Sequence, residues 1–258
     1  MTKFKKIIPA LCMLLISAVL MGTSTYAWFS MNRTVKASGM QVTAQSNSRY
    51  LMIATGEANK TCAAIQALTV NTSATVTGNT NLYPAAFNNS GDAIEVEDAS
   101  KDTSESVKDG KTTIADKTWY TANSTAFDNA TTRKTNVMAI DGTTLKLNEY
   151  VRTDTFYLAL SQGSADYSNK KLSVAFAKGE TDDAALAVVV KIGEVYIKLD
   201  STTASGDFTG ITVPSTGNAL EVTVYTYING ESTNVHSAYV NGGHTITGTA
   251  TVTFTLEA

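Results

Sequence analysis

The stretch that decides the fold is Thr245-Ile-Thr-Gly-Thr-Ala-Thr-Val-Thr-Phe-Thr-Leu256, near the carboxyl end of the 258-residue chain. Its even-numbered positions are apolar or small, whereas every odd-numbered position is threonine. Successive side chains of a β-strand point to opposite faces, so this period of two predicts a strand. Threonine suits a half-exposed sheet face because its branched Cβ favours extended backbone and its hydroxyl tolerates water. We expect one buried and one solvated face.

The same alternation recurs along the chain in short segments separated by Gly, Asn and Asp turns. These predicted strands are residues 40–44, 49–54, 68–76, 156–160, 172–176, 186–192, 194–199 and 220–224. The run at 186–192 is almost continuously apolar, which is typical of a strand covered on both faces. With almost no helical periodicity outside the amino-terminal segment, the pattern predicts an all-β fold, an antiparallel and jelly-roll-like β-sandwich.

A loop-rich insertion at residues 79–148 interrupts the predicted strands. Small polar and charged residues dominate it, as in Asp98 to Gly110. A stretch of this length is too long to be wholly structureless in a compact domain, so we expect short strands or a helix within it. We expect the apolar rings near Leu82-Tyr83-Pro84 and Trp119-Tyr120 to dock on the sandwich. Residues 28–258 then form a single β-sandwich domain.

The amino-terminal 27 residues have the three-part layout of a secretory signal. Three lysines occur before residue 7, Ile7 to Met21 is uncharged and mostly apolar, and a small polar segment ends at Ala27. This layout predicts a hydrophobic signal helix, cleavage by signal peptidase between Ala27 and Trp28, and a secreted or cell-surface protein. The alternative is a retained membrane helix, although the apolar part is shorter than the roughly 20 residues that a span needs.

Composition and charge exclude several classes of partner. Hydrophobic residues make up 43 % of the chain, enough to build a core. The formal charge of −3 becomes −6 when three signal lysines are subtracted, because −3 minus 3 is −6. Nucleic acids and anionic lipids need clustered Lys and Arg, so neither is expected as a partner. Outside the signal segment Cys62 is the sole cysteine, and we expect its thiol to be buried rather than reactive.

The sequence contains no recognisable catalytic motif, cofactor site or metal site. The two histidines, His236 and His244, belong to no His-Glu-x-x-His pattern, and neither a Gly-x-Ser-x-Gly elbow nor a phosphate loop occurs. The acidic runs at 95–98 and 182–183 could offer calcium carboxylate oxygens, but such runs are usually solvated faces. We therefore expect no enzyme; a secreted hydrolase would have to use one of the histidines.

Four aromatic residues could bind a partner or build the interior. Trp119, Tyr120, Tyr225 and Tyr227 can stack on sugars if they are exposed. Tyr225 and Tyr227 share one strand face, opposite Val222 and Val224, so they form either an exposed pair or the second buried face of a central strand. The exposed alternative defines a second hypothesis, an adhesin-like sandwich whose insertion holds a glycan or host surface.

Both ends of the chain resemble a known family. The segment Thr25-Tyr26-Ala27-Trp28-Phe29-Ser30-Met31-Asn32, followed by Ala37-Ser38-Gly39 and an alternating strand, resembles the TasA/camelysin-like family of bacterial exported proteins. The closing strands from Val222 to Glu231 and at 251–256 look like the last hairpin of related sandwiches. The resemblance implies a jelly-roll body and a biofilm-matrix fibre subunit. The metallopeptidase activity ascribed to some members finds no support in the histidine pattern.

The resemblance also implies a route to assembly, in which an extended segment of one subunit completes the sheet of the next. After cleavage, residues 28–36 would form a free arm long enough for one strand. The candidate donor-strand residues are Trp28, Phe29, Met31, Arg33 and Val35. The alternative is that this arm pairs with its own sheet. The leading functional hypothesis is an exported, non-enzymatic protein that associates with copies of itself into fibres or a surface matrix.

Overall fold

The computed structural model describes part of the chain. The described residues are 34–36, 50–68, 81–104, 107, 109–121, 137–178, 184–232, 235, 244–245 and 250–257, with 34–36 and 244–245 described by backbone alone. The predicted signal helix, the cleavage point at Ala27 and Trp28, and the strands predicted at 40–44 and 69–76 lie outside them. None of the helices in the described part combines the length and apolar character needed to cross a membrane.

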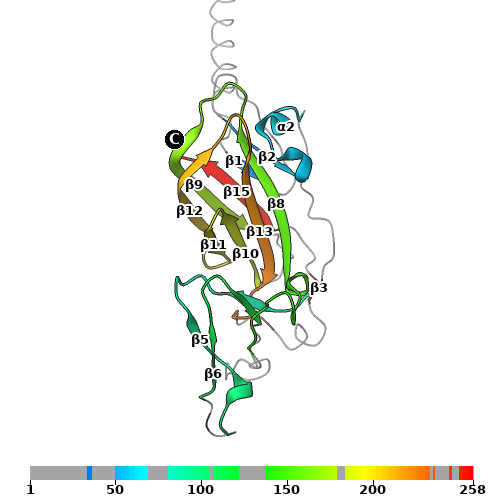
Figure 1. Cartoon of the computed structure of the whole chain (residues 1–258), viewed down its shortest axis with the longest axis vertical. Helices are drawn as coiled ribbons and strands as arrows, with labels where there is room; N and C mark the ends of the chain where they lie inside the picture. The colour runs from blue at the N-terminus through cyan, green and yellow to red at the C-terminus, as the bar shows by residue number, and fades with distance from the viewer. Residues whose placement is uncertain are drawn as a thin grey trace, which may run out of the picture.

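Two antiparallel sheets form the sandwich (Figure 1). The first sheet has the strand order β1 (Thr34–Lys36), β15 (Thr251–Leu256), β9 (Tyr167–Ala177) and β12 (Ser205–Val213). The second has the order β11 (Val195–Leu199), β10 (Leu186–Ile192), β13 (Leu220–Ile228), β8 (Val151–Leu160) and β2 (Leu51–Thr55). The prediction of an all-β fold with antiparallel sheets is confirmed.

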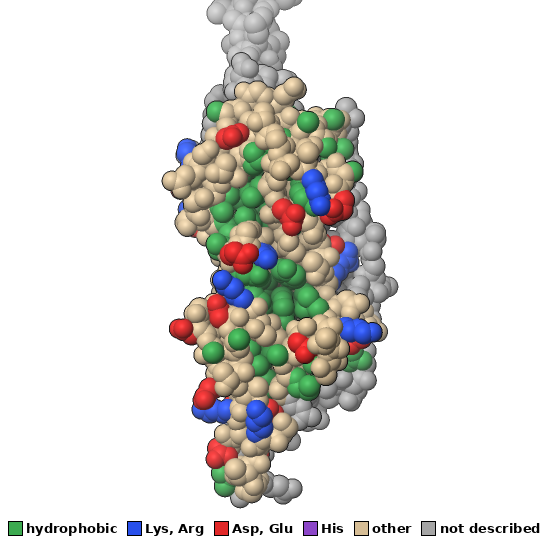
Figure 2. Space-filling view, in the orientation of Figure 1, with side chains coloured by type: hydrophobic (Ala, Val, Ile, Leu, Met, Phe, Trp, Pro, Cys, Tyr) green, Lys and Arg blue, Asp and Glu red, His purple; other side chains and the backbone are tan. Residues whose placement is uncertain are grey.

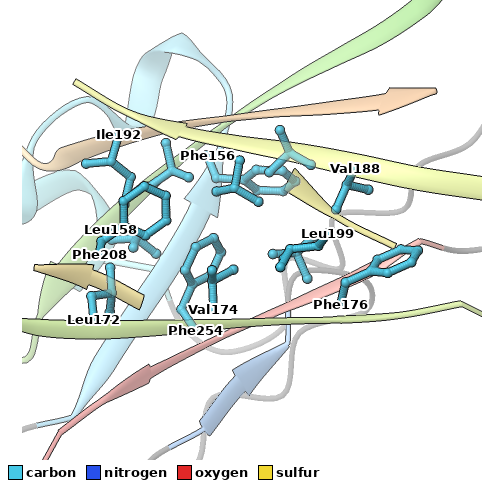
Figure 3. Packing of buried hydrophobic residues seen from close by; sticks show 14 of the residues in the cluster. Phe156, Leu158, Leu172, Val174, Phe176, Val188, Ile192, Leu199, Phe208 and Phe254 are labelled. Atoms are coloured by element: carbon cyan, nitrogen blue, oxygen red, sulfur yellow. The ribbon is translucent and has the colours of Figure 1, made fainter. Parts of the chain in front are cut away.

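The core lies between the two sheets (Figure 3). Leu172 and Val174 of β9 and Phe254 of β15 face Phe156 and Leu158 of β8 across this layer, all at most 3 % exposed. Their alternation with polar neighbours is the period that the sequence shows, since every second side chain points inward. In β15 the apolar positions 252, 254 and 256 are buried and the threonines between them are half-buried, as predicted.

The outer face of the second sheet is covered at both ends. At one end, the short helix α2 (Cys62–Gln66) packs on β2 and β8. Cys62 is fully buried there and its Sγ donates to the carbonyl of Pro214 at 3.6 Å, while the Gln66 amide donates to the carbonyls of Leu160 and Ser215. The prediction that Cys62 is buried is therefore confirmed, and burial raises the pKa of its thiol.

At the other end the insertion covers the same face. It contains five short strands, β3 (Asn81–Leu82), β4 (Ala85–Phe87), β5 (Ile94–Glu97), β6 (Lys111–Ile114) and β7 (Trp119–Thr121). Strand β4 pairs with β7, and the hairpin of β5 and β6 extends away from the sandwich at the far end of the molecule (Figure 1). Ala86, Val96, Ile114, Tyr120 and Val137 form a small core of its own. The expected short strands are present.

The structure corrects the prediction of one continuous final strand at 245–256. Residues His244 and Thr245 form β14, which pairs with β3 in a separate two-stranded sheet, whereas β15 begins at Thr251. Gly248, midway along the alternating stretch, has no side chain to pack and weakens a strand. The pattern therefore spans two strands with different partners.

Candidate functional site

The edge of the first sheet is where the described structure meets the predicted donor arm. Thr34, Val35 and Lys36 pair with Thr255, Phe254 and Thr253 of β15, in antiparallel register within the same chain. The other side of β15 pairs with β9. In the described part of the chain, the three residues of β1 cover the backbone edge of β15. The other candidate arm residues, Trp28, Phe29, Met31 and Arg33, lie outside the described residues.

The register limits how much of the arm this edge can hold. Because β1 and β15 are antiparallel, the residue before Thr34 corresponds to the residue after Thr255, and so on along both strands. Strand β15 ends at Leu256, the position opposite Arg33 in this register. If this register continued, residues 28–32, the part of the arm that contains Trp28 and Phe29, would lie beyond the last residue of β15.

The second sheet has a strand edge of interest where β10 is shorter than its neighbour β13. Lys191 of β10 pairs with Thr223 of β13, and β10 ends one residue later at Ile192. The first residues of β13, beginning with Leu220, pair with β8 on one side, and on the other side none of the described strands pairs with them. The backbone at this position is open to an added strand.

Beside this edge the core reaches the surface. Ile197, Ile211 and Leu220 are only partly buried, although they pack against the core. Figure 2 shows hydrophobic side chains gathered in the middle of the face that it draws, with charged side chains around them. At the opposite end of β12 the sheets meet closely, because a Cβ on Gly206 would lie 2.7 Å from Cγ2 of Ile197.

The aromatic candidates lie mainly in the interior. Trp119 is 8 %, Tyr120 1 % and Tyr227 0 % exposed, and Tyr225 is half-buried. The Trp119 ring lies 4.9 Å from that of Tyr227, edge to face, and 5.9 Å from that of Tyr225. Tyr225 and Tyr227 are therefore the second, covered face of a central strand. The expectation that Trp119 docks on the sandwich is confirmed, and its buried ring is not available to stack on a glycan.

A polar pocket of about 270 Å³ lies at the carboxyl ends of β11 and β13. Asp200 and Glu231 line it, but both carboxylates are engaged. Asp200 accepts from the amides of Thr202 and Thr203, and Glu231 accepts from the Tyr120 hydroxyl at 2.9 Å and lies 3.7 Å from Lys198 Nζ. Of these contacts, the hydrogen bond from Tyr120 joins the insertion to the sandwich.

The acidic run at 95–98 is structural rather than a calcium site. Glu95 pairs with Lys111 at 3.2 Å. Asp98 is buried and accepts hydrogen bonds from Ser100, Thr112 and the amide of Val137. Burial alone would raise the pKa of Asp98, but these hydrogen bonds outweigh it and hold the pKa below its usual value.

The structure says little about the remaining candidates for a metal or catalytic site. Residues 182–183 and His236 are outside it, and His244 is described by its backbone in β14. Within the described residues, no three His, Cys, Asp or Glu side chains come together as a metal site would require.

Comparisons with known proteins add little. No family model matches the chain, and no curated protein matches it. Among solved structures, one that matches is described as "Crystal Structure of FLHE". It shares 11 % identity over 41 % of this chain and 79 % of that chain, with a TM-score of 0.25. A likeness at this level carries no argument about the function of the chain.

Proposed function

We propose that the protein is an exported structural subunit that associates with copies of itself into extracellular fibres or a surface matrix. The amino-terminal arm would serve as the donor strand. The observation that carries the proposal is the short β1: in the described part of the chain three residues occupy the edge of β15, and in the same register the apolar residues that precede them would lie beyond its last residue. We expect the apolar part of the arm to pair with a sheet edge of a second copy rather than with its own subunit.

The strand order supports a jelly-roll body for this subunit. If β8 is left out, the other eight strands of the four- and five-stranded sheets can be numbered 1 to 8 along the chain. In this numbering the strand order is 1-8-3-6 in the first sheet and 2-7-4-5 in the second. This is the arrangement of a jelly roll, two interlocked Greek keys in two packed sheets. We regard β8 as an extra strand. It lies between strands 2 and 7 of this numbering, and it follows the insertion along the chain.

The sequence supports export and assembly independently of the sheet edges. The three-part amino-terminal segment with a cut between Ala27 and Trp28 would free the arm, and both chain ends resemble the TasA/camelysin-like family. The start of β13, where no described strand pairs on the side of β10, is the acceptor position that best suits an apolar strand, with the half-buried Leu220 and Ile211 beside it. Alternate side chains of the arm would pack at this position.

A paired cysteine variant tests whether the arm changes partner on assembly. Thr34 and Thr255 are direct cross-strand neighbours, so Thr34→Cys with Thr255→Cys places two thiols within reach of a disulfide. In the monomer we expect an intrachain disulfide. If β1 pairs with β15 of the next subunit in the fibre, oxidation after assembly will link neighbouring chains by disulfides. A non-reducing gel will then show a ladder of covalent multimers. Cys62 is buried and does not compete.

The single variants Thr34→Cys and Thr255→Cys serve as controls, since neither can form the designed bond within one chain. Deletion of residues 28–36 should abolish fibres while leaving the sandwich folded, as monitored by circular dichroism and electron microscopy. Fibres that form normally after this deletion would remove the arm from the mechanism. A mature chain that stays monomeric at high concentration would remove self-assembly altogether.

A further inference from the structure

Of the aromatic contacts within the described part of the chain, one joins two tyrosines. Tyr83 lies between β3 and β4, and Tyr150 directly precedes β8. Their ring centroids are 5.7 Å apart and the ring planes are inclined by 45°. The amide of Tyr83 donates to the carbonyl of Glu149 at 2.9 Å, so the backbone holds the two rings side by side.

The pair is also more exposed than several other described tyrosines. Tyr83 is 37 % exposed and Tyr150 is partly buried, whereas Tyr120, Tyr167 and Tyr227 are at most 1 % exposed. Burial, and then the Glu149 carboxylate and Tyr83, raise the pKa of Tyr150, so its phenol is protonated at neutral pH. Two neighbouring, accessible phenols are the substrates of one-electron oxidants.

We propose that Tyr83 and Tyr150 form a site of intramolecular dityrosine cross-linking by a haem peroxidase that uses hydrogen peroxide. Each phenol loses one electron and one proton to give a tyrosyl radical. The two radicals couple through the ring carbons next to the hydroxyl-bearing carbons, and the hydrogen on each coupled carbon moves to its phenol oxygen. The two electrons and two protons convert one hydrogen peroxide molecule into two water molecules.

The cross-link would join the two ends of the insertion. Tyr83 lies near the point where the chain leaves the sandwich, and Tyr150 lies where it returns to β8. Among the described residues the only cysteine is the free, buried Cys62, which leaves this part of the chain without a disulfide. A covalent bond between residues 83 and 150 would restrict the unfolded chain as a disulfide over the same loop does. The inference does not depend on the proposed function.

The test is peroxidase treatment of the purified protein at low concentration. We expect a monomer whose intact mass has fallen by two hydrogen atoms and which shows dityrosine fluorescence. After proteolysis, the peptide that contains Tyr83 should be joined to the peptide that contains Tyr150. A joined product that maps to any other pair of tyrosines overturns the proposal.

Two variants separate this pair from general tyrosine oxidation. Tyr83→Phe and Tyr150→Phe keep the ring packing but lack the phenol, and each should abolish the intramolecular product. Tyr196→Phe, which changes another partly buried tyrosine, should leave the yield unchanged. Free N-acetyltyrosine amide reports whether the oxidant is active. If it couples while the wild-type protein gives no cross-linked monomer, the proposal is wrong.

Discussion

At the scale of single residues, Gly206 sets how closely the two sheets approach. A Cβ at this position would lie 2.7 Å from Cγ2 and 3.5 Å from Cδ1 of Ile197 on β11. No side chain can be added without a shift of the Ile197 side chain or of one of the strands, because real Cβ contacts are essentially never so short. The close approach of β12 to β11 therefore requires glycine for its size, and not for its backbone conformation.

We expect Gly206→Ala to lower the free energy of unfolding by about 1–3 kcal/mol, the usual cost of overpacking a well-filled interior. Urea denaturation measures this change, provided that the dependence of the free energy of unfolding on urea concentration is the same for both proteins. Because Ile197→Val removes only Cδ1, the atom at 3.5 Å, it should leave the clash with Cγ2 in place. Ile197→Ala in the Gly206→Ala background should relieve the clash, and additive losses in the double variant would contradict this account.

Asp98 is a residue-scale source of pH dependence. Its folded pKa lies below the ordinary value of 3.8, so its charge stabilises the folded state above that value. This stability is lost as the pH falls through 3.8 toward the lower folded pKa. We expect Asp98→Asn to cost about 1–2 kcal/mol at pH 7 and to flatten the decline in stability between pH 4 and pH 2. Thermal unfolding across this range measures both, and Glu95→Gln on the same hairpin should change neither.

At the scale of elements, the insertion is fastened to the sandwich chiefly by Trp119. The indole lies against Tyr227, Tyr225 and Phe87, and it is 8 % exposed. The hydroxyl of the neighbouring Tyr120 reaches Glu231, and the amide of Gly230 donates to Ala85 at 2.9 Å. Phe87 of β4 adds a second buried ring, whose centroid lies 5.2 Å from that of Tyr196 on β11. Two buried rings and a few polar contacts thus hold an element that also has a small core of its own.

We expect Trp119→Ala to destabilise the protein by about 3–5 kcal/mol, as for other buried aromatic truncations. Much of the loss should appear as undocking of the insertion from the outer face of β10 and β13. Hydrogen exchange should then increase in β4 and β7 more than in β9 and β15, which lie in the other sheet. Uniform exchange throughout the sandwich would show that the insertion and the two sheets unfold as one unit.

At the scale of the whole molecule, the strands that alternate cleanly could be predicted from the sequence, and those with glycine interruptions could not. The run at 186–192 matches β10 because a strand buried on both faces has few alternatives. Strand β12 was missed because its pairing shifts between Phe208 and Ile211, around Gly210 with a φ of +69°. Helix α2 was missed because five residues are too few to show a helical period.

The candidate site was only partly predictable for a different reason. Alternation shows that a segment is a strand, but the choice of neighbour depends on contacts far away in the sequence. Nothing near Val35 indicates that its partner is Phe254, and nothing near Leu220 indicates that β10 stops short of it. The docking of Trp119 was predicted, but the sequence left open whether Tyr225 and Tyr227 are exposed, because their burial depends on where the insertion docks.

The position of β15 within the first sheet has a consequence for the order of folding. Strand β15, at residues 251–256, lies between β1 and β9, so two strands made earlier in synthesis cannot belong to one sheet until it arrives. The pair of Val35 and Phe254 closes a loop of more than two hundred residues, and such non-local contacts form slowly. A chain built this way stays open while it emerges. Such a delay would suit the proposed export, because a chain that crosses a membrane through a secretion channel must be unfolded.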